Sequence, residues 1–379
     1  MQSIQTWAGI DVSARTLSVR RWSRESESER EFTNDEAGHR ELVKWLGKRA
    51  RAGVEATGVY HLQLALRLRE AGVEVMVVNP RVAKDFARAM SNRSKTDRVD
   101  AGTLLEFVRR MEFRAWTAPS AGVLELRELA RRRTELVGTL VEEKNRLHAK
   151  SVAAISRAVV EDVKAHLDEL RQRITRLEKA ALEVIRGEAE LGATLDRLVS
   201  APGIGTRSAM LLLSELMILD PTMTTRQLVA YAGLDPRVYE SGTSVHKQVR
   251  ISKVGNARLR AILYMVALSA VRHDRGARLF FARLVQRGKK PMQALVAVMR
   301  KYLHGIWTVI QRRVAFDSSV LFAASLAQAE SSDSAVPANQ PEPEQGHPQG
   351  RSEAKELRQQ LDPDPAEATR SRKRKSKAA

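Results

Sequence analysis

Apolar and polar residues follow two different spacings in the N-terminal part of the chain. Patterns typical of strands mark residues 6–12, 16–22, 28–34, 52–57 and 73–78. Apolar residues three or four positions apart, typical of helices, mark residues 35–49, 60–72 and 97–111. Strands and amphipathic helices in this order predict an α/β domain in which helices cover a mixed sheet.

The pattern changes between Ser120 and Ala201, a stretch without proline that is rich in Leu, Ala, Glu and Arg. Steps of three and four positions, the spacing of a coiled-coil seam, separate its apolar residues Leu167, Leu170, Ile174, Leu177, Ala181 and Val184. We predict two long helices here. The seam needs a partner helix, which could come from the same chain or from a second copy in a dimer.

Pro202 opens a third region, which is predicted to be mostly helical to about Ala324. The residues beyond it are rich in Pro, Ser, Gln and Glu and end in the basic arm RSRKRKSKAA. Because this tail has few apolar groups to offset its ordering entropy, we expect it to be disordered. The predicted organisation is an α/β domain at 1–115, a coiled-coil helical spacer at 116–195, a C-terminal domain at 196–324 and the tail at 325–379.

Positive charge exceeds negative charge along most of the chain. Its 379 residues include 64 Lys and Arg against 45 Asp and Glu, a formal net charge of +19. From Gln328 onward the chain has nine acidic and nine basic residues, so the excess lies before that point. Phosphate neutralisation by Lys and Arg supplies most non-specific binding to nucleic acid, which makes nucleic acid the expected partner.

Several classes of protein are excluded by composition. The chain has no cysteine, which excludes disulfides, thiolate metal sites and cysteine nucleophiles. No apolar run approaches the roughly 20 residues of a membrane-spanning helix, and the first residues lack the charged and apolar regions of a signal peptide. We therefore expect a cytoplasmic protein that does not enter a membrane.

Four carboxylates stand in or at the ends of predicted elements of the α/β domain. Asp11 lies in the first strand, Glu55 ends a later strand, and Asp97 and Asp100 begin the helix of SKTDRVDAGTLLE. Such a set suits a divalent-metal site in a ribonuclease-H-like sheet. Mg²⁺ prefers oxygen ligands, and metal ions neutralise charge while a phosphoryl group is transferred.

Three cations surround the aspartate pair of that helix, at Arg93, Lys95 and Arg98, and we expect them to attract a nucleic-acid backbone. Purely structural roles are also open for the pair. Asp97 could cap its helix, and Asp100 could form an ion pair with a neighbouring arginine. The strand aspartate is harder to explain in this way, since an ionised group in an apolar strand is costly unless it is paired or bound to a metal.

Two stretches of the C-terminal region have features that suit nucleic-acid contacts. In SAPGIGTRSAM, Gly203 and Gly205 allow a tight helix-hairpin-helix-like turn whose amides could bind a phosphate, although a plain helix start is the alternative. In YESGTSVHKQVRISKVGN, small hydroxyl residues flank a glycine. Cations follow at Lys247, Arg250, Lys253, Arg258 and Arg260. A serine that attacks a phosphodiester needs such room and charge, yet most Ser-Gly pairs are only loops.

Half a dozen motifs occur together and in order. GIDVSA, GVEATGVY, VVNPRVAKDFARAM and SKTDRVDAGTLLE are followed by APGIGTRSAMLLLSEL and YESGTSVHKQVRISKVGNARLRAILYMVA. Over roughly residues 5–315, the chain thereby resembles the DEDD transposases of bacterial insertion sequences, recombinases that use a bridge RNA as a guide. The tail lies outside the resemblance.

The resemblance implies an N-terminal domain like the Holliday-junction resolvase RuvC, a coiled-coil spacer and a C-terminal transposase domain. It assigns the DEDD tetrad, with Mg²⁺ as cofactor, to Asp11, Glu55, Asp97 and Asp100. Members of the family assemble their sites between protomers, which implies a dimer or a tetramer.

The resemblance also implies a serine that becomes covalently joined to DNA. The matching residue is Ser241, with Ser244 as a rival. From the residues alone, His246 could assist as a base, although a lone histidine in a loop is more often simply exposed. The implied function is a transposase that inserts and excises its own mobile element. Its partners would be donor and target DNA and a bridge RNA that specifies the target. Two rival functions are a Mg²⁺-dependent structure-specific nuclease that uses water, and a non-catalytic scaffold that binds nucleic acid.

Overall fold

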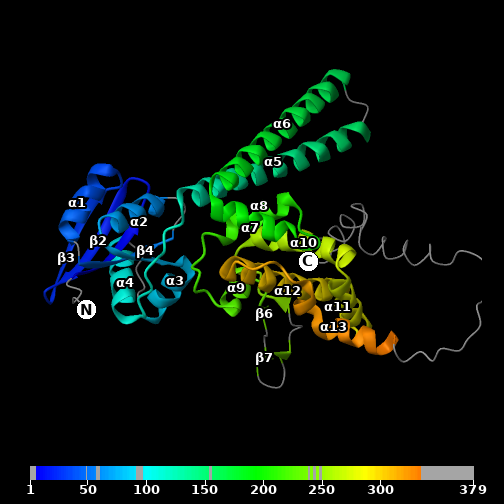
Figure 1. Cartoon of the computed structure of the whole chain (residues 1–379). Helices are drawn as coiled ribbons and strands as arrows, with labels where there is room; N and C mark the ends of the chain where they lie inside the picture. The colour runs from blue at the N-terminus through cyan, green and yellow to red at the C-terminus, as the bar shows by residue number, and fades with distance from the viewer. Residues whose placement is uncertain are drawn as a thin grey trace, which may run out of the picture. The chain divides into compact units, whose positions relative to one another are not determined.

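The computed structural model describes residues 6–47, 49–56, 60–90, 97–152, 156–237, 240–241, 245–246 and 250–333. Its N-terminal part contains a sheet of the strands β1 (Thr6–Val12), β2 (Thr16–Ser23), β3 (Ser26–Thr33), β4 (Ala50–Glu55) and β5 (Glu74–Val78) (Figure 1). The strand order is β3-β2-β1-β4-β5, in which β1 is antiparallel to β2 and parallel to β4. The predicted mixed α/β sheet is therefore confirmed.

One face of this sheet is covered by α1 (Glu36–Leu46) and α2 (Tyr60–Glu70). Even-numbered residues of β1 such as Ile10 point to this face and form a fully buried cluster with Leu42 of α1 and Leu64 of α2. Arg21 of β2 also faces this side, where it donates a hydrogen bond to the carbonyl oxygen of Trp45 at 2.6 Å. The alternation read from the sequence thus sends the apolar residues into this core.

The other face carries α4 (Asp97–Arg110), with α3 (Pro80–Ala89) beside it. At the centre of this face, between apolar residues such as Trp7 and Met76, the sheet presents two glycines. A Cβ atom at Gly9 would lie 2.1 Å from the carbonyl oxygen of Ala101 and 2.2 Å from the amide nitrogen of Leu105. At Gly53, the neighbour of Gly9 on β4, it would lie 2.4 Å from a methyl carbon of Val108. The backbone of α4 therefore lies directly on the sheet.

A helical hairpin follows, made of α5 (Ala121–Val152) and α6 (Arg157–Gly187), and α7 (Ala189–Val199) continues from it. The predicted seam on α6 packs against α5 of the same chain, where Leu170 and Ile174 form a buried cluster with Leu136. The partner helix is thus internal. Two helices were predicted for this stretch, and the structure has a third. The break lies at Glu188, between α6 and α7, where the carboxylate accepts hydrogen bonds from the Ser120 hydroxyl and the Gly122 amide.

An ion network fastens the base of the hairpin to the next helix, α8 (Thr206–Leu216). Glu178 of α6 accepts hydrogen bonds from Arg133 of α5 at 2.8 Å and from Arg207 of α8 at 2.9 Å. Burial alone would raise the pKa of Glu178, but these two guanidinium groups lower it below its ordinary value. The carboxylate therefore stays ionised and ties three helices together.

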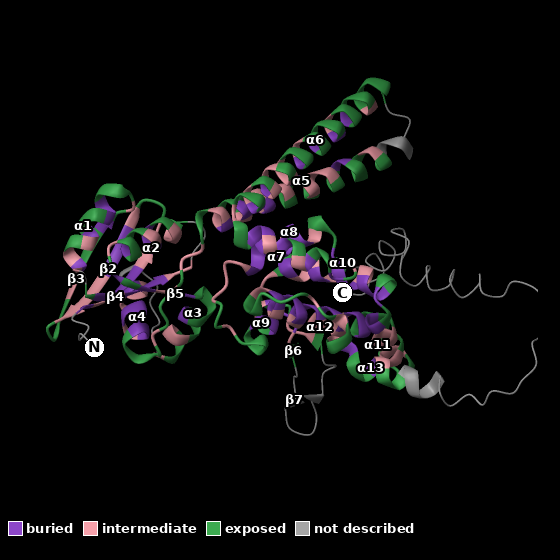
Figure 2. Ribbon diagram, in the orientation of Figure 1, coloured by how far each residue is buried: buried purple, intermediate pink, exposed green. Residues whose placement is uncertain are grey.

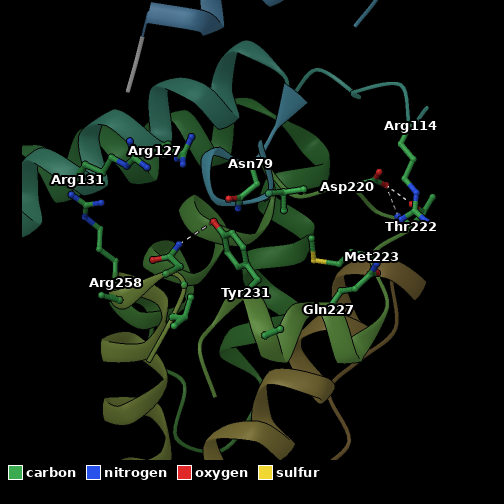
Figure 3. A pocket seen from close by; sticks show the side chains of 16 residues that line it. Asn79, Arg114, Arg127, Arg131, Asp220, Thr222, Met223, Gln227, Tyr231 and Arg258 are labelled. Carbon is green, nitrogen blue, oxygen red and sulfur yellow. Dashed lines mark hydrogen bonds between the residues drawn. The ribbon is translucent and has the colours of Figure 1, made fainter. Parts of the chain in front are cut away.

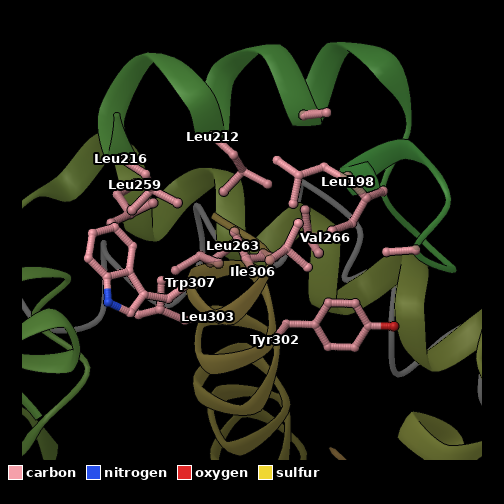
Figure 4. Packing of buried hydrophobic residues seen from close by; sticks show 14 of the residues in the cluster. Leu198, Leu212, Leu216, Leu259, Leu263, Val266, Tyr302, Leu303, Ile306 and Trp307 are labelled. Atoms are coloured by element: carbon pink, nitrogen blue, oxygen red, sulfur yellow. The ribbon is translucent and has the colours of Figure 1, made fainter. Parts of the chain in front are cut away.

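The C-terminal part is mostly helical, as predicted. Beside α7 and α8 it contains α9 (Thr225–Tyr231), α10 (Ala257–His273), α11 (Arg275–Gln286), α12 (Pro291–Arg312) and α13 (Ser318–Asp333). Their apolar sides are buried against one another (Figure 2). Figure 4 shows the centre of this cluster, where Leu212 of α8, Leu263 of α10 and Ile306 of α12 meet. The hydroxyl of Tyr302 lies 2.8 Å from both Asp274 and the carbonyl oxygen of Pro202.

The helix α13 continues beyond Ala324, where the tail was predicted to begin. Phe322 anchors it, since this side chain is 1% exposed and packs against Gly276 and the ring of Phe280. The residues after Asp333, including the basic arm, lie outside the described part of the chain. None of the described helices combines the length and the apolar composition that crossing a lipid bilayer requires.

The contact at Gly9 generates a prediction. Gly9→Ala should lower the free energy of unfolding by more than about 2 kcal/mol, because the added methyl group would force α4 away from β1. Gly138→Ala in α5 is a matched control, since nothing lies within 4 Å of its Cβ position. That change should raise stability by up to ~1 kcal/mol through helix propensity. Urea unfolding followed by circular dichroism compares the two; equal effects would contradict the close contact.

Candidate active site and nucleic-acid interface

Two of the predicted site residues lie side by side on the α4 face of the sheet. Parallel pairing aligns Gly9 with Gly53 and Ile10 with Val54, so the next residues in register are Asp11 and Glu55. Both carboxylates lie on the same face as the two glycines, because side chains alternate along a strand. Both residues are partly buried.

The direction of α4 over this face follows from two contacts with β2. Near the end of the helix, the guanidinium carbon of Arg109 lies 4.3 Å from the ring centroid of Trp22. Closer to its start, Gly102 lies against the side chain of Arg20. Trp22 pairs with the first part of β1 and Arg20 with its middle. Going backwards along α4 therefore leads toward the C-terminal end of β1.

The first turn of α4 is thereby placed over the end of β1 that carries Asp11. Asp100 lies one turn before Leu104, which packs over Gly53, and so stands on the β4 side of the helix. Asp97 lies one turn before Ala101, which packs over Gly9. The predicted helix is present from Asp97, the first residue described after position 90. Its backbone places the two helix positions near the C-terminal ends of β1 and β4, where Asp11 and Glu55 lie.

The strands and the helix bring these positions near one another, but the described side chains do not form a metal site. Among the described residues, no group of three or more His, Asp and Glu side chains is arranged to hold a metal ion. The side chains of Asp97 and Arg98 are not part of that description, and Arg93 and Lys95 lie outside the described residues. The donor atoms nevertheless suit a hard cation, because Asp11, Glu55 and Asp100 offer carboxylate oxygens.

The candidate nucleophile lies on a narrow two-stranded ribbon instead of an irregular loop. The strand β7 (Glu240–Ser241) pairs with β8 (Val245–His246), so that Ser241 stands opposite Val245. The description of Ser241 and His246 is limited to the backbone, and Ser244 and Lys247 lie outside the described residues.

The base of this ribbon is a second strand pair, β6 (Pro236–Arg237) with β9 (Arg250–Ile251) (Figure 1). Asp235 just before β6 accepts a hydrogen bond from the Ser252 hydroxyl at 2.5 Å, and its carbonyl accepts one from the Ser252 amide at 2.8 Å. These bonds join the two strands of the ribbon base to each other, and Ile251 of β9 packs against the apolar cluster of the helices.

A cationic cavity of about 720 Å³ lies at the ribbon base. Apolar side chains such as Leu234, Ile251 and Val296 form part of its lining. Among the described residues, its lining contains no Asp or Glu and five cations: Arg250, Lys253, Lys289, Lys290 and Arg300. None of the five forms an ion pair with another residue of the described chain. Sequence reasoning found the first two and missed the others, although the KK pair before Pro291 is a visible signal.

The two glycines of the predicted phosphate-binding turn have different roles. Gly203 has a φ of +87°, and a Cβ there would lie 2.7 Å from the backbone nitrogen of Ala270. This glycine therefore allows α10 to pack closely against the turn. Gly205 is exposed at the start of α8, where helix amides without internal partners can meet an anion.

The two remaining predicted cations, Arg258 and Arg260, have different surroundings. Arg260 donates a hydrogen bond to the carbonyl oxygen of Ala232 at 2.9 Å, which gives this guanidinium a structural contact. Arg258 is exposed and lines a second pocket near the N-terminus of α10 (Figure 3). That pocket also contains Arg127 and Arg131, which sequence reasoning missed. Their only signal in the sequence is a spacing of four on one helix.

Comparisons with known proteins identify the family. A model of IS110-type DEDD transposases, described as "Transposase", matches residues 8–150. A second model, "Transposase IS116/IS110/IS902 family", matches residues 195–282. The first match spans the sheet, α4 and α5, and the second spans the glycine turn and the ribbon.

Several known relatives are similar over most of their length. The chain is 29% identical over 324 residues to a pilin gene-inverting protein of Moraxella bovis, covering 83% of this chain and 99% of the relative. The corresponding protein of Moraxella lacunata has the same identity and coverage. A transposase for insertion sequence element IS1328 of Yersinia enterocolitica is 27% identical over 225 residues, covering 54% of this chain and 66% of the relative. The chain belongs to the IS110 family of DEDD transposases and is a DNA transposase.

Proposed function

We propose that this transposase cuts and rejoins DNA with two groups of residues, a Mg²⁺-binding carboxylate set on a RuvC-like sheet and the serine of the ribbon. The observation that carries the proposal is the row formed by Asp11 and Glu55 on adjacent parallel strands, toward which the first turn of α4 points. The sheet order, with three antiparallel strands followed by two parallel ones, supports a ribonuclease-H-like fold.

The carboxylates would hold the metal, and we assign this role to Asp11, Glu55, Asp97 and Asp100. A bound Mg²⁺ would supply positive charge to the phosphate during the transfer. The protein's own contribution is to keep Asp11 and Glu55 at fixed positions on paired strands. The helix end can then complete the set when nucleic acid and metal enter.

The ribbon serine would make the covalent bond to DNA. In this step the Ser241 oxygen bonds to phosphorus, the bond from phosphorus to one deoxyribose oxygen breaks, and the serine proton passes to a base. The released deoxyribose oxygen takes up a proton. Because the phosphoserine ester preserves the bond energy, a second DNA strand end can reverse the step with a new partner. The cationic cavity at the ribbon base would hold flanking phosphates through residues such as Arg250 and Lys253.

A guide RNA and a homo-oligomer complete the proposal. The family suggests both, and the +19 net charge provides a surface that attracts RNA as well as DNA. Because α5 already covers the α6 seam, we place the protomer contacts outside that seam. We retain the division into segments 1–115, 116–195, 196–324 and 325–379 as part of this proposal.

The carboxylate row can be tested with Asp11→Asn. The change should reduce DNA cleavage at least about 100-fold, because it removes a metal ligand while keeping the shape of the side chain. Mn²⁺ binding, measured by electron paramagnetic resonance, should weaken in parallel. Glu41→Gln on α1, an exposed carboxylate paired with Arg30, is the control and should leave both unchanged. Normal cleavage and Mn²⁺ binding by Asp11→Asn would remove this residue from the site.

The serine assignment is tested by covalent adduct formation. Ser241→Ala should abolish protein–DNA adducts detected by denaturing electrophoresis, while DNA binding survives, because the change removes the hydroxyl that would form the phosphoester. Ser244→Ala should retain adducts. If the two results are exchanged, the nucleophile is Ser244. If cleavage continues in both variants without any adduct, water attacks and the chain acts as a metal-dependent nuclease.

A further inference from the structure

Two arginines on α5 have buried donors that no described residue uses. Arg127 and Arg131 are one helical turn apart, and the Nε atom of each is buried without a hydrogen-bond partner among the described residues. Figure 3 shows both side chains at the pocket beside Tyr231 and Arg258. A buried N–H without a hydrogen-bond partner is costly, so a structural role alone does not account for the pair.

The charges around this pair are not balanced. Burial, and next the charge of Arg131, lower the pKa of Arg127 from its ordinary value. The nearby carboxylate is Glu215, which is 3% exposed and lies 4.0 Å from the Nε of Arg131. Its other oxygen accepts a hydrogen bond from Asn256 at 2.7 Å. Glu215 therefore lies near two partly buried guanidinium groups, and the pocket lining adds Arg114 and Arg258 against one carboxylate, Asp220.

The N-terminus of α10 adds further donors to the same pocket. Asn256 caps this 17-residue helix, accepting a hydrogen bond from the Leu259 amide at 3.0 Å. The same side chain donates to Glu215, so the cap and the carboxylate hold each other in place. Ala257 and Arg258 form the first turn and line the pocket. Amides of a first turn have no carbonyl partner within the helix and favour an anion.

From these observations we infer that the pocket between α5 and the start of α10 binds a backbone phosphate of nucleic acid through Arg127, Arg131 and Arg258. A phosphodiester matches the site because it carries one negative charge and offers several acceptor oxygens. The inference rests on the proposed action on nucleic acid. The site is separate from both the carboxylate row and the serine ribbon, and it would position a strand without taking part in the bond changes.

Binding measured at several salt concentrations tests the site with the full-length protein. Arg127→Gln and Arg131→Gln should each weaken binding of a labelled oligonucleotide roughly 10-fold at low salt. The slope of log affinity against log salt should fall by about 0.7 to 0.9 for each phosphate that the variant no longer binds. The same sequence is tried as single-stranded DNA, duplex DNA and RNA, and the form whose slope falls identifies the occupant. Arg132→Gln is the control, because Arg132 is exposed and pairs with Glu135 at 3.1 Å.

Thermal unfolding distinguishes a binding role from a structural one. Without nucleic acid, Arg127→Gln should unfold at the wild-type temperature or above it, since the change removes a buried N–H that has no hydrogen-bond partner. Inorganic pyrophosphate should raise the unfolding temperature of the wild type more than that of the variant. The inference is overturned if Arg127→Gln unfolds at a lower temperature, or if the salt slopes of both variants match the wild type. Adduct formation by Ser241 is measured in a separate assay. A failure of the serine mechanism would therefore change neither the unfolding temperatures nor the salt slopes.

Discussion

The close contact between α4 and the sheet is the constraint on which the candidate active site depends. Gly9 and Gly53 remove the side chains that would hold the helix away, so that backbone meets backbone. The sheet thereby gives up apolar burial at its centre. In return, polar side chains at the ends of β1 and β4 lie beneath the start of a helix. A larger residue at either glycine would enlarge the spacing by ångströms, which is enough to separate ligands of a single ion.

The C-terminal part uses a different principle to position its polar groups. A large apolar cluster centred on α8, α10 and α12 forms a rigid base, and the polar elements project from its margins. The strand pair β6–β9 contacts this cluster through Ile251. The cap of α10 is fastened through Asn256 and Glu215. Each candidate contact with nucleic acid is thus a short segment supported by a packed helix.

Much of the N-terminal architecture could be predicted from the sequence because its signals are local. Alternation in β1, the strand end at Glu55 and the helix of residues 97–110 each depend on a few neighbouring residues, and the structure contains all three. The role of Gly9 in the close contact with α4 was not predicted, because it can be recognised only when Ala101 is known to lie directly above this glycine.

The other omissions have the same physical origin. Whether a helical seam is covered by its own chain depends on how α5 folds back, which spacing along α6 does not encode. The pocket around Arg127 unites α5 with residues more than a hundred positions later in the chain, and each of its arginines resembles any other surface arginine in the sequence. Family motifs identified the serine stretch, while its ribbon form depends on pairing between two strands of two residues each.

The register of β1 has a consequence for how reliably the chain folds. Ile10 faces the apolar core, and its neighbour Asp11 faces α4. A slip of one residue would exchange the two faces, placing a carboxylate among the side chains of α1 and α2 and a bulky apolar residue under the helix. Such a misfolded sheet would bury an uncompensated charge, so it is disfavoured by several kcal/mol, on the order expected for a buried ion without a partner. Asp11, which we assign to the metal site, therefore also favours the correct strand register. In a sheet shifted by one residue, the same carboxylate would be buried in the apolar core and would destabilise the fold.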